Sequence, residues 1–125
     1  MAIYKLKKVG AFARKHGIND RTLAVAANDV RNGWYDADLG GGLYKQRLAR
    51  DGGGKSGGFR TLITHRTSKH LFFVYAYPKN ARSNIGPDEE QGFKKMARMF
   101  GAMSKTELDY AVLSGELEEV PDGDS

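Results

Sequence analysis

Apolar residues in the first third of the chain recur at the three- and four-residue spacing of amphipathic helices. The predicted first helix has the apolar residues Leu6, Val9 and Ala13. It ends at Gly17, and Asn19 or Asp20 can then cap a second helix, which ends at Gly33. The apolar stripe of the second helix consists of Leu23, Ala27, Val30 and Trp34. The pattern predicts a helical hairpin with this stripe in the core.

From Leu43 the apolar period changes from 3.6 residues to 2, which is typical of β-strands. Strands are predicted at residues 43–49, 59–65 and 70–77, and the last of them is strongly apolar. In the first strand Lys45 and Arg47 lie on the same face. Short connections between successive strands predict an antiparallel meander.

Helical signals return after the third predicted strand. Pro87 suits the first turn of a helix, and the acidic residues that follow it complement the positive helix end. The buried stripe of this helix is expected to be Phe93, Ala97 and Phe100. Ser104 and Glu107 form a capping box for a short last helix through about Leu113. The order predicts an α+β domain with an N-terminal helical hairpin, a small antiparallel sheet, and two helices packed on one face.

The chain has 125 residues, which suits a single domain over residues 1–125, and it contains no cysteine. Disulfides, thiolate metal sites and cysteine nucleophiles are therefore excluded. The N-terminal residues lack the apolar stretch of a signal peptide, and the longest apolar run, 71–77, is too short to span a bilayer. We expect a soluble, cytoplasmic protein that does not act on membranes.

Charge is unevenly distributed along the chain. The formal net charge is +5, but residues 115–125 hold five carboxylates and no Lys or Arg. Without that tail, twenty basic residues face ten acidic ones, which is a net charge of +10. Between Leu39 and Pro87 the only acid is Asp51, while nine residues are basic: Lys45, Arg47, Arg50, Lys55, Arg60, Arg66, Lys69, Lys79 and Arg82. Such a block favours a polyanionic partner, above all nucleic acid, over a merely solubilising face. The acidic tail is expected to be a disordered solubilising terminus, and the alternative is that it folds over the basic region.

Two other features, a pattern like a phosphate-binding loop and three histidines, do not predict nucleotide or metal binding. Residues 49–56 approximate a phosphate-binding loop, but such a loop must lead from a parallel strand into a helix, and here strands are predicted on both sides. The histidines, His16, His65 and His70, lack metal-ligand spacing, so we expect no metal or other cofactor. A catalytic acid role for His65 or His70 is the weaker alternative to a structural one.

RNA cleavage needs neither a metal nor a protein nucleophile, because the 2′-hydroxyl of the RNA attacks the phosphate. The enzyme must align that hydroxyl, stabilise the added negative charge and protonate the leaving oxygen. Lysine and arginine can do this, since arginine clamps phosphate through paired hydrogen bonds and a lysine with a lowered pKa can act as a base.

Three segments carry a family resemblance: DLGGGLYKQRLA at 38–49, GKSGGFRTL at 54–62 and FFVYAYPKNARSNI at 72–85. Together they resemble the HigB-type branch of the RelE/ParE toxins, over about residues 5–120. The resemblance implies a RelE-like fold and a toxin that cleaves mRNA, ribosome-dependently or free, or that inhibits gyrase in the ParE branch. It also implies a cognate antitoxin, often of the helix-turn-helix type, through which the complex reaches operator DNA.

The resemblance implies roles for individual residues. Lys45, Arg47 and Arg60 match the catalytic basic residues of the family. The residues expected to bind RNA are Lys55, Arg66, Lys79, Asn80 and Arg82. RelE-like enzymes also use an aromatic residue near the C-terminus, for which Tyr110 is the nearby candidate.

The sequence thus predicts the toxin of a type II toxin–antitoxin system, an mRNA interferase acting on ribosome-bound mRNA as a metal-independent endoribonuclease. Two alternatives stay open. One is a ParE-like protein that inhibits DNA gyrase without catalysis. The other is a degenerate toxin that only binds its antitoxin in the operator complex.

Overall fold

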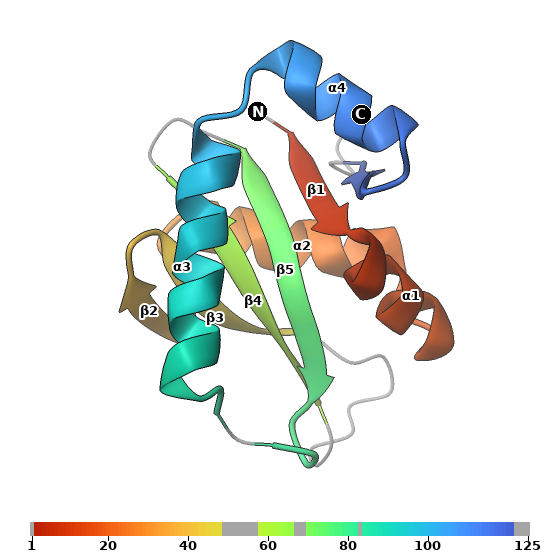
Figure 1. Cartoon of the computed structure of the whole chain (residues 1–125). Helices are drawn as coiled ribbons and strands as arrows, with labels where there is room; N and C mark the ends of the chain where they lie inside the picture. The colour runs from red at the N-terminus through yellow and green to blue at the C-terminus, as the bar shows by residue number, and fades with distance from the viewer. Residues whose placement is uncertain (1, 49–57, 67–69, 83, 122–125) are drawn as a thin grey trace.

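The computed structural model describes residues 2–48, 58–66, 70–82 and 84–121 (Figure 1). Its elements are β1 Ile3–Leu6, α1 Lys7–Lys15, α2 Asp20–Arg31, β2 Ala37–Gly40, β3 Leu43–Leu48, β4 Phe59–His65, β5 Leu71–Pro78, α3 Pro87–Gly101, α4 Lys105–Leu113 and β6 Leu117–Val120. No helix in these ranges is long and apolar enough to cross a membrane.

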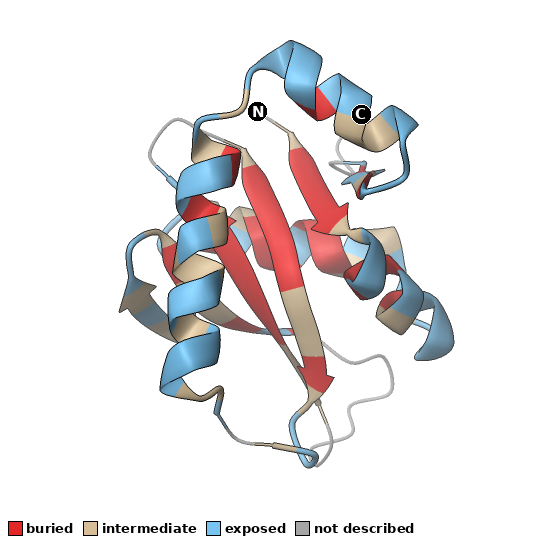
Figure 2. Ribbon diagram, in the orientation of Figure 1, coloured by how far each residue is buried: buried red, intermediate tan, exposed pale blue. Residues whose placement is uncertain are grey.

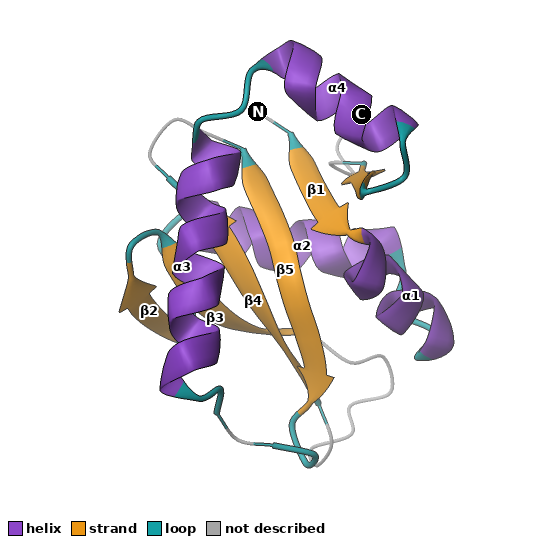
Figure 3. Cartoon of the chain, in the orientation of Figure 1, coloured by secondary structure: helices purple, strands orange, loops and turns teal. Residues whose placement is uncertain are grey.

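The six strands form one sheet in the order β2-β3-β4-β5-β1-β6 (Figure 3). The predicted antiparallel meander is confirmed as β3, β4 and β5. The N-terminal strand β1 lies parallel to β5 and antiparallel to β6. The fold class is therefore α+β with a mostly antiparallel open sheet, as predicted.

Helices cover both faces of the sheet, not one face as the sequence suggested, because the central strands are apolar on both sides. Ile63 of β4 and Phe73 of β5 pack with α1 and α2. Their neighbours Leu62 and Phe72 point the other way and pack with Phe100 of α3 and with α4. In Figure 1, α2 lies behind the sheet and α3 in front of it, and Figure 2 shows the buried strands between them.

A β-bulge divides β5 into two halves. Leu62 pairs with Tyr75 and the next residue, Ile63, pairs with Phe73, so β5 has one extra residue, Val74, between them. A bulge of this kind reverses the alternation of side chains beyond it. Tyr75 therefore packs in the same cluster as Val74, on the face covered by α3.

Local signals explain the helix boundaries. The side chain of Asn19 accepts a hydrogen bond from the backbone N–H of Thr22 at 2.9 Å, so of the two predicted cap residues of α2, Asn19 is the cap. Ser104 and Glu107 form the predicted capping box of α4, with bonds of 3.1 and 2.8 Å. Of the stripe expected on α3, Ala97 and Phe100 are buried, while Phe93 is only half-buried.

Three strands were not predicted from the sequence: β1, β2 and β6, each four residues long. Leu6, expected in the first helix, ends β1. The acidic tail is also not wholly a disordered terminus, because β6 pairs with β1 through residue 120 and buries Leu117 and Val120. Such short strands show no apolar alternation long enough to detect. They are stabilised by pairing with neighbouring strands that are distant in the sequence.

The prediction that Trp34 lies in the core is wrong, since this residue is 72% exposed. Helix α2 ends at Arg31, and Gly33 takes a positive φ of 89°, which turns the chain away from the helix axis. The stripe of Leu23, Ala27 and Val30 is buried as expected, but its extension beyond the helix end does not hold.

The segment resembling a phosphate-binding loop, 49–56, lies outside the described residues. The elements on either side of it, β3 and β4, are antiparallel neighbours. A phosphate-binding loop requires a helix after the strand, so this flanking structure agrees with our rejection of that motif.

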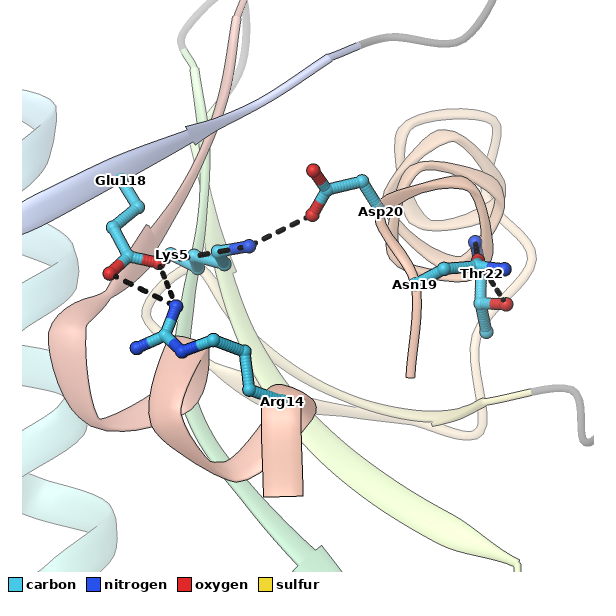
Figure 4. A network of polar contacts seen from close by, with 6 residues as sticks. All are labelled: Lys5, Arg14, Asn19, Asp20, Thr22 and Glu118. Carbon is cyan, nitrogen blue, oxygen red and sulfur yellow. Dashed lines mark hydrogen bonds and ion pairs between the residues drawn. The ribbon is translucent and has the colours of Figure 1, made fainter. Parts of the chain in front are cut away.

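A buried lysine ties β1 to two other elements (Figure 4). The side chain of Lys5 is 10% exposed, and its Nζ lies 2.8 Å from Asp20 Oδ1 of α2 and 3.8 Å from Glu118 Oε1 of β6. Arg14 reaches the same Glu118 oxygen at 3.3 Å. Strand β6 thus attaches through both its backbone and a carboxylate.

We predict that Lys5→Ala lowers the free energy of unfolding by about 2–3 kcal/mol, because the buried alkyl stem and both ion pairs are lost. Urea unfolding measures this change. The control is Lys105→Ala, which removes an ion pair whose lysine is 86% exposed and should cost about 0.5 kcal/mol or less. Equal losses in the two variants would contradict a structural role for Lys5.

Candidate functional site

Strand register places two arginines and a tyrosine in one row across the sheet. Arg47 of β3 is the Cα partner of Arg60 of β4, which is in turn the partner of Tyr77 of β5. Directly paired residues share a face. One step along, Lys45, Leu62 and Tyr75 form a parallel row on the same face. The structure therefore brings together Lys45, Arg47 and Arg60, all predicted to be catalytic.

One carboxylate joins the two arginines. Asp36 Oδ1 lies 3.2 Å from Arg47 Nε, and Asp36 Oδ2 lies 3.5 Å from Arg60 Nε. The Arg60 side chain is 13% exposed and that of Arg47 is 67% exposed, so Arg60 is the fixed member and Arg47 the accessible one. Asp36 was not predicted from the sequence, because a carboxylate just before a four-residue strand gives no signal. The register of β2 on β3 brings it beside the arginines.

Two described residues between β5 and α3, Arg82 and Asn84, contact side chains of this face or of α3. Lys45 Nζ donates a 3.0 Å hydrogen bond to Asn84 Oδ1. Arg82 forms two hydrogen bonds with the carboxylate of Glu89, at 2.6 and 3.1 Å, and a third with the Tyr75 hydroxyl at 3.2 Å. These hydrogen bonds raise the pKa of Arg82 and lower that of Glu89. The guanidinium of Arg82 stays charged, and its bonds to Glu89 and Tyr75 fix its position just after the end of β5.

The guanidinium of Arg82 lies over the aromatic rings of two tyrosines of β5. The Arg82 guanidinium carbon lies 5.9 Å from the ring centroids of both Tyr75 and Tyr77. The two rings are 5.4 Å apart. Because the bulge at Val74 turns both tyrosines to this face, cation–π attraction adds to the ion pair in fixing Arg82.

The hydroxyl of Tyr77 is buried and has no hydrogen-bond partner among the residues that the structure describes. Burial raises the pKa of Tyr77, and the nearby Arg60 and Arg82 oppose that rise. The phenol therefore stays protonated at neutral pH beside two cations. It contributes a neutral wall rather than a charge to the site.

The other predicted RNA-binding residues are placed unevenly. Lys79 and Asn80 are exposed just beyond the end of β5, where the Lys79 N–H bonds to the Gly58 carbonyl at 2.9 Å, at the Arg60 end of the sheet. Arg66 follows the opposite end of β4, about 20 Å along the strand from Arg60. Lys55 lies outside the described residues. RNA binding by these four residues stays a prediction.

Tyr110, the candidate aromatic near the C-terminus, lies away from the cationic rows. It is 67% exposed on α4 and lines a separate cleft with Met103, Ala111 and Glu116. The described residues contain no group of three His, Cys, Asp or Glu side chains that could hold a metal ion. His70 has a structural contact, since its Nδ1 accepts the Ala2 N–H at 2.8 Å.

The donors of this site are suited to an anion that accepts hydrogen bonds through several of its oxygens. The face presents two guanidiniums and an ammonium on rigid strands, with a third guanidinium fixed above them. Such an array binds a phosphodiester and stabilises additional negative charge on it. The fold and this face define a small α+β protein with a cationic sheet face that is chemically suited to an oxyanion such as phosphate.

The family of the chain follows from its comparison with known families. The model of the RelE toxin of the RelE/RelB toxin–antitoxin system matches residues 1–120, and the chain belongs to this family. As a RelE-family toxin it has a cognate antitoxin as its partner. No curated protein matches the chain closely enough to count as a relative.

We predict that Tyr77→Phe leaves the free energy of unfolding unchanged or raises it by up to about 1 kcal/mol, because a buried hydroxyl without a partner only costs desolvation. The matched control is Thr61→Val, since the buried Thr61 hydroxyl donates to the Gln46 carbonyl at 2.9 Å. That control should lose about 1 kcal/mol in urea unfolding. A comparable loss in Tyr77→Phe would show that its hydroxyl is bonded.

The same variant tests the pKa. Because folding raises the pKa of Tyr77 above 10.0 by desolvation, the ionised phenol is disfavoured in the folded state. The wild type therefore loses stability as the pH rises from 10 through the folded-state pKa, a loss that Tyr77→Phe lacks. Phenolate absorbance of the folded protein should therefore lose amplitude above pH 10 in Tyr77→Phe.

Proposed function

We propose that this toxin is an mRNA interferase of the HigB-like branch, a metal-independent endoribonuclease that cleaves ribosome-bound mRNA and so inhibits translation in the cytoplasm. The observation that carries the proposal is the row of Arg47 and Arg60 beside Lys45 on one sheet face. Motifs at 38–49, 54–62 and 72–85 support the branch.

In this mechanism the RNA 2′-oxygen attacks the adjacent phosphorus and loses its proton, while the bond to the 5′-oxygen breaks and that oxygen gains a proton. Lys45 and Arg47 bind the scissile phosphate, and Arg60 stabilises the charge that develops on it. The rigid strands supply the alignment. Arg82, Lys79 and Asn80 hold the flanking RNA.

Asp36 sets the resting state of the site. It neutralises part of the charge of two neighbouring guanidiniums that would otherwise repel each other. A bound phosphate takes over this role, and Asp36 keeps both Nε atoms oriented while the outer guanidinium nitrogens turn to the phosphate. A carboxylate from the antitoxin would neutralise the site in the same way.

We predict that Arg60→Ala abolishes growth arrest when the toxin is induced without an antitoxin, and abolishes the new 5′ ends of mRNA seen by primer extension. Arg60→Lys keeps a charge but loses the paired hydrogen bonds, so it should retain only weak activity. Arg98→Ala, an exposed arginine of α3, should remain toxic.

If induction instead arrests growth with intact mRNA and accumulated gyrase–DNA complexes, the ParE-like alternative replaces this proposal. If the wild type is harmless yet still binds its antitoxin, the degenerate alternative does.

We further predict that Asp36→Asn lowers both KM and kcat for mRNA cleavage. The loss of one negative charge tightens binding of the polyanion, by about 2- to 10-fold at low salt. The freed guanidiniums lose their orientation, so kcat falls about 10-fold. Asp109→Asn is the matched control because it removes an equal charge from an exposed pair on α4, and it should change neither constant by more than about 2-fold.

A further inference from the structure

Next to the cationic rows the surface has a cleft of about 350 Å³ that the proposed mechanism does not use. Its lining includes Val25 of α2, Trp34 and Tyr35 of the α2–β2 connection, and Gln46 of β3. Val25 is 50% exposed, Trp34 72% and Tyr35 39%. Large apolar side chains gathered at one exposed site commonly mark a binding surface.

The aromatic walls of the cleft are held in place. The Trp34 N–H donates to the Asp29 carbonyl at 2.7 Å, and the Trp34 carbonyl accepts from Gln46 Nε2 at 2.8 Å. Tyr35 packs on Tyr44, with ring centroids 4.8 Å apart. The backbone is thus fixed on both sides of an indole that remains open to solvent. Binding of a ligand there does not have to order this part of the backbone.

The cleft is continuous with the proposed phosphate site. Arg47 and Asp36, which form the ion pair at 3.2 Å described above, also line the cleft. The rest of the lining lies on the α2 side of β3, where the Gln46 side chain bonds to the Ala26 and Trp34 carbonyls, so Arg47 is the residue at which a bound phosphate and the cleft meet. The groups closest to a bound phosphate in RNA are the ribose and base of the same nucleotide and of its neighbour.

Aromatic surface beside a phosphate-binding arginine fits one ligand chemistry best. Single-stranded RNA stacks its bases on exposed aromatic rings while cationic groups hold the backbone. The side chains of Thr22 and Asp29, also in the lining, offer hydrogen-bonding groups for the edge of a base. The mixture of flat apolar walls and a few polar groups suits a base better than a purely apolar peptide side chain.

We infer that this cleft, which we name the Trp34 cleft, binds an unpaired base of the RNA substrate next to the phosphate held by Arg47 and Arg60. Trp34 is the stacking surface, and the cleft selects which nucleotide lies beside the scissile bond. This inference rests on the proposed RNA cleavage and assigns its substrate contact.

The test uses Trp34 as its own reporter, because it is the single tryptophan of the chain. A short single-stranded oligonucleotide with 2′-O-methyl groups, which block cleavage, is titrated into the intact protein at low salt. We expect saturable quenching of Trp34 fluorescence. The same oligonucleotide with an abasic central residue should bind with less quenching.

Variants separate stacking from charge. By fluorescence anisotropy of a labelled oligonucleotide, Trp34→Ala should weaken binding about 5- to 100-fold, and Trp34→Phe should restore part of it. Leu113→Ala is the control, because Leu113 is an exposed apolar residue of α4 outside the cleft lining, and it should bind as the wild type does. Circular dichroism confirms that each variant is folded.

The outcomes distinguish the two proposals. If Arg60→Ala loses oligonucleotide binding but Trp34 is neither quenched nor needed, the base-binding cleft is overturned, the RNA site stands, and the exposed aromatic residues belong to a protein contact instead. If no oligonucleotide binds to the wild type although primer extension shows mRNA cleavage in cells, the base-binding cleft is overturned and the proposed function stands. If mRNA cleavage is absent as well, the proposed function fails and the inference fails with it.

Discussion

The central strands β4 and β5 are apolar on both faces, and the arrangement of the helices and of the other strands depends on burying both faces. A sheet with two apolar faces must be covered twice, so the N-terminal helices bury Ile63 and Phe73 while the C-terminal helices bury Leu62 and Phe72. The meander supplies only three strands, and β1 enters from the N-terminus to cover the open edge of β5. The cationic rows lie on the α3 face, where the sheet extends past the apolar cluster.

The sequence predicts the regular parts of this fold well, because their signals are local. The cap at Asn19, the capping box at Ser104 and the three strands of the meander all depend on neighbours within a few residues. Strand β6 depends on residues more than a hundred positions away, as Ile3 pairs with Val120. Without knowledge of that partner, the sequence predicts that the four residues of β6 belong to an acidic tail.

In the candidate site, too, the residues with local signals were predicted and those that depend on distant pairing were not. Lys45 and Arg47 share a face by simple alternation, and the motif resemblance adds Arg60. Asp36 becomes visible only through the pairing of β2 with β3. The orientation of Tyr75 and Tyr77 was undetermined for a different reason: alternation counted from Phe73 puts both on the α1 and α2 side, and one extra residue, Val74, puts them on the other.

The position of β1 between β5 and β6 also bears on when this protein can become active during its synthesis. The first strand made is an inner strand of the sheet, and its two neighbours are made about three-fifths of the way along the chain and near its end. Contacts of such large sequence separation form late and slowly. The nascent chain cannot complete its sheet until residue 120 has left the ribosome, so translation leaves an interval in which an antitoxin can meet the toxin before it is fully folded.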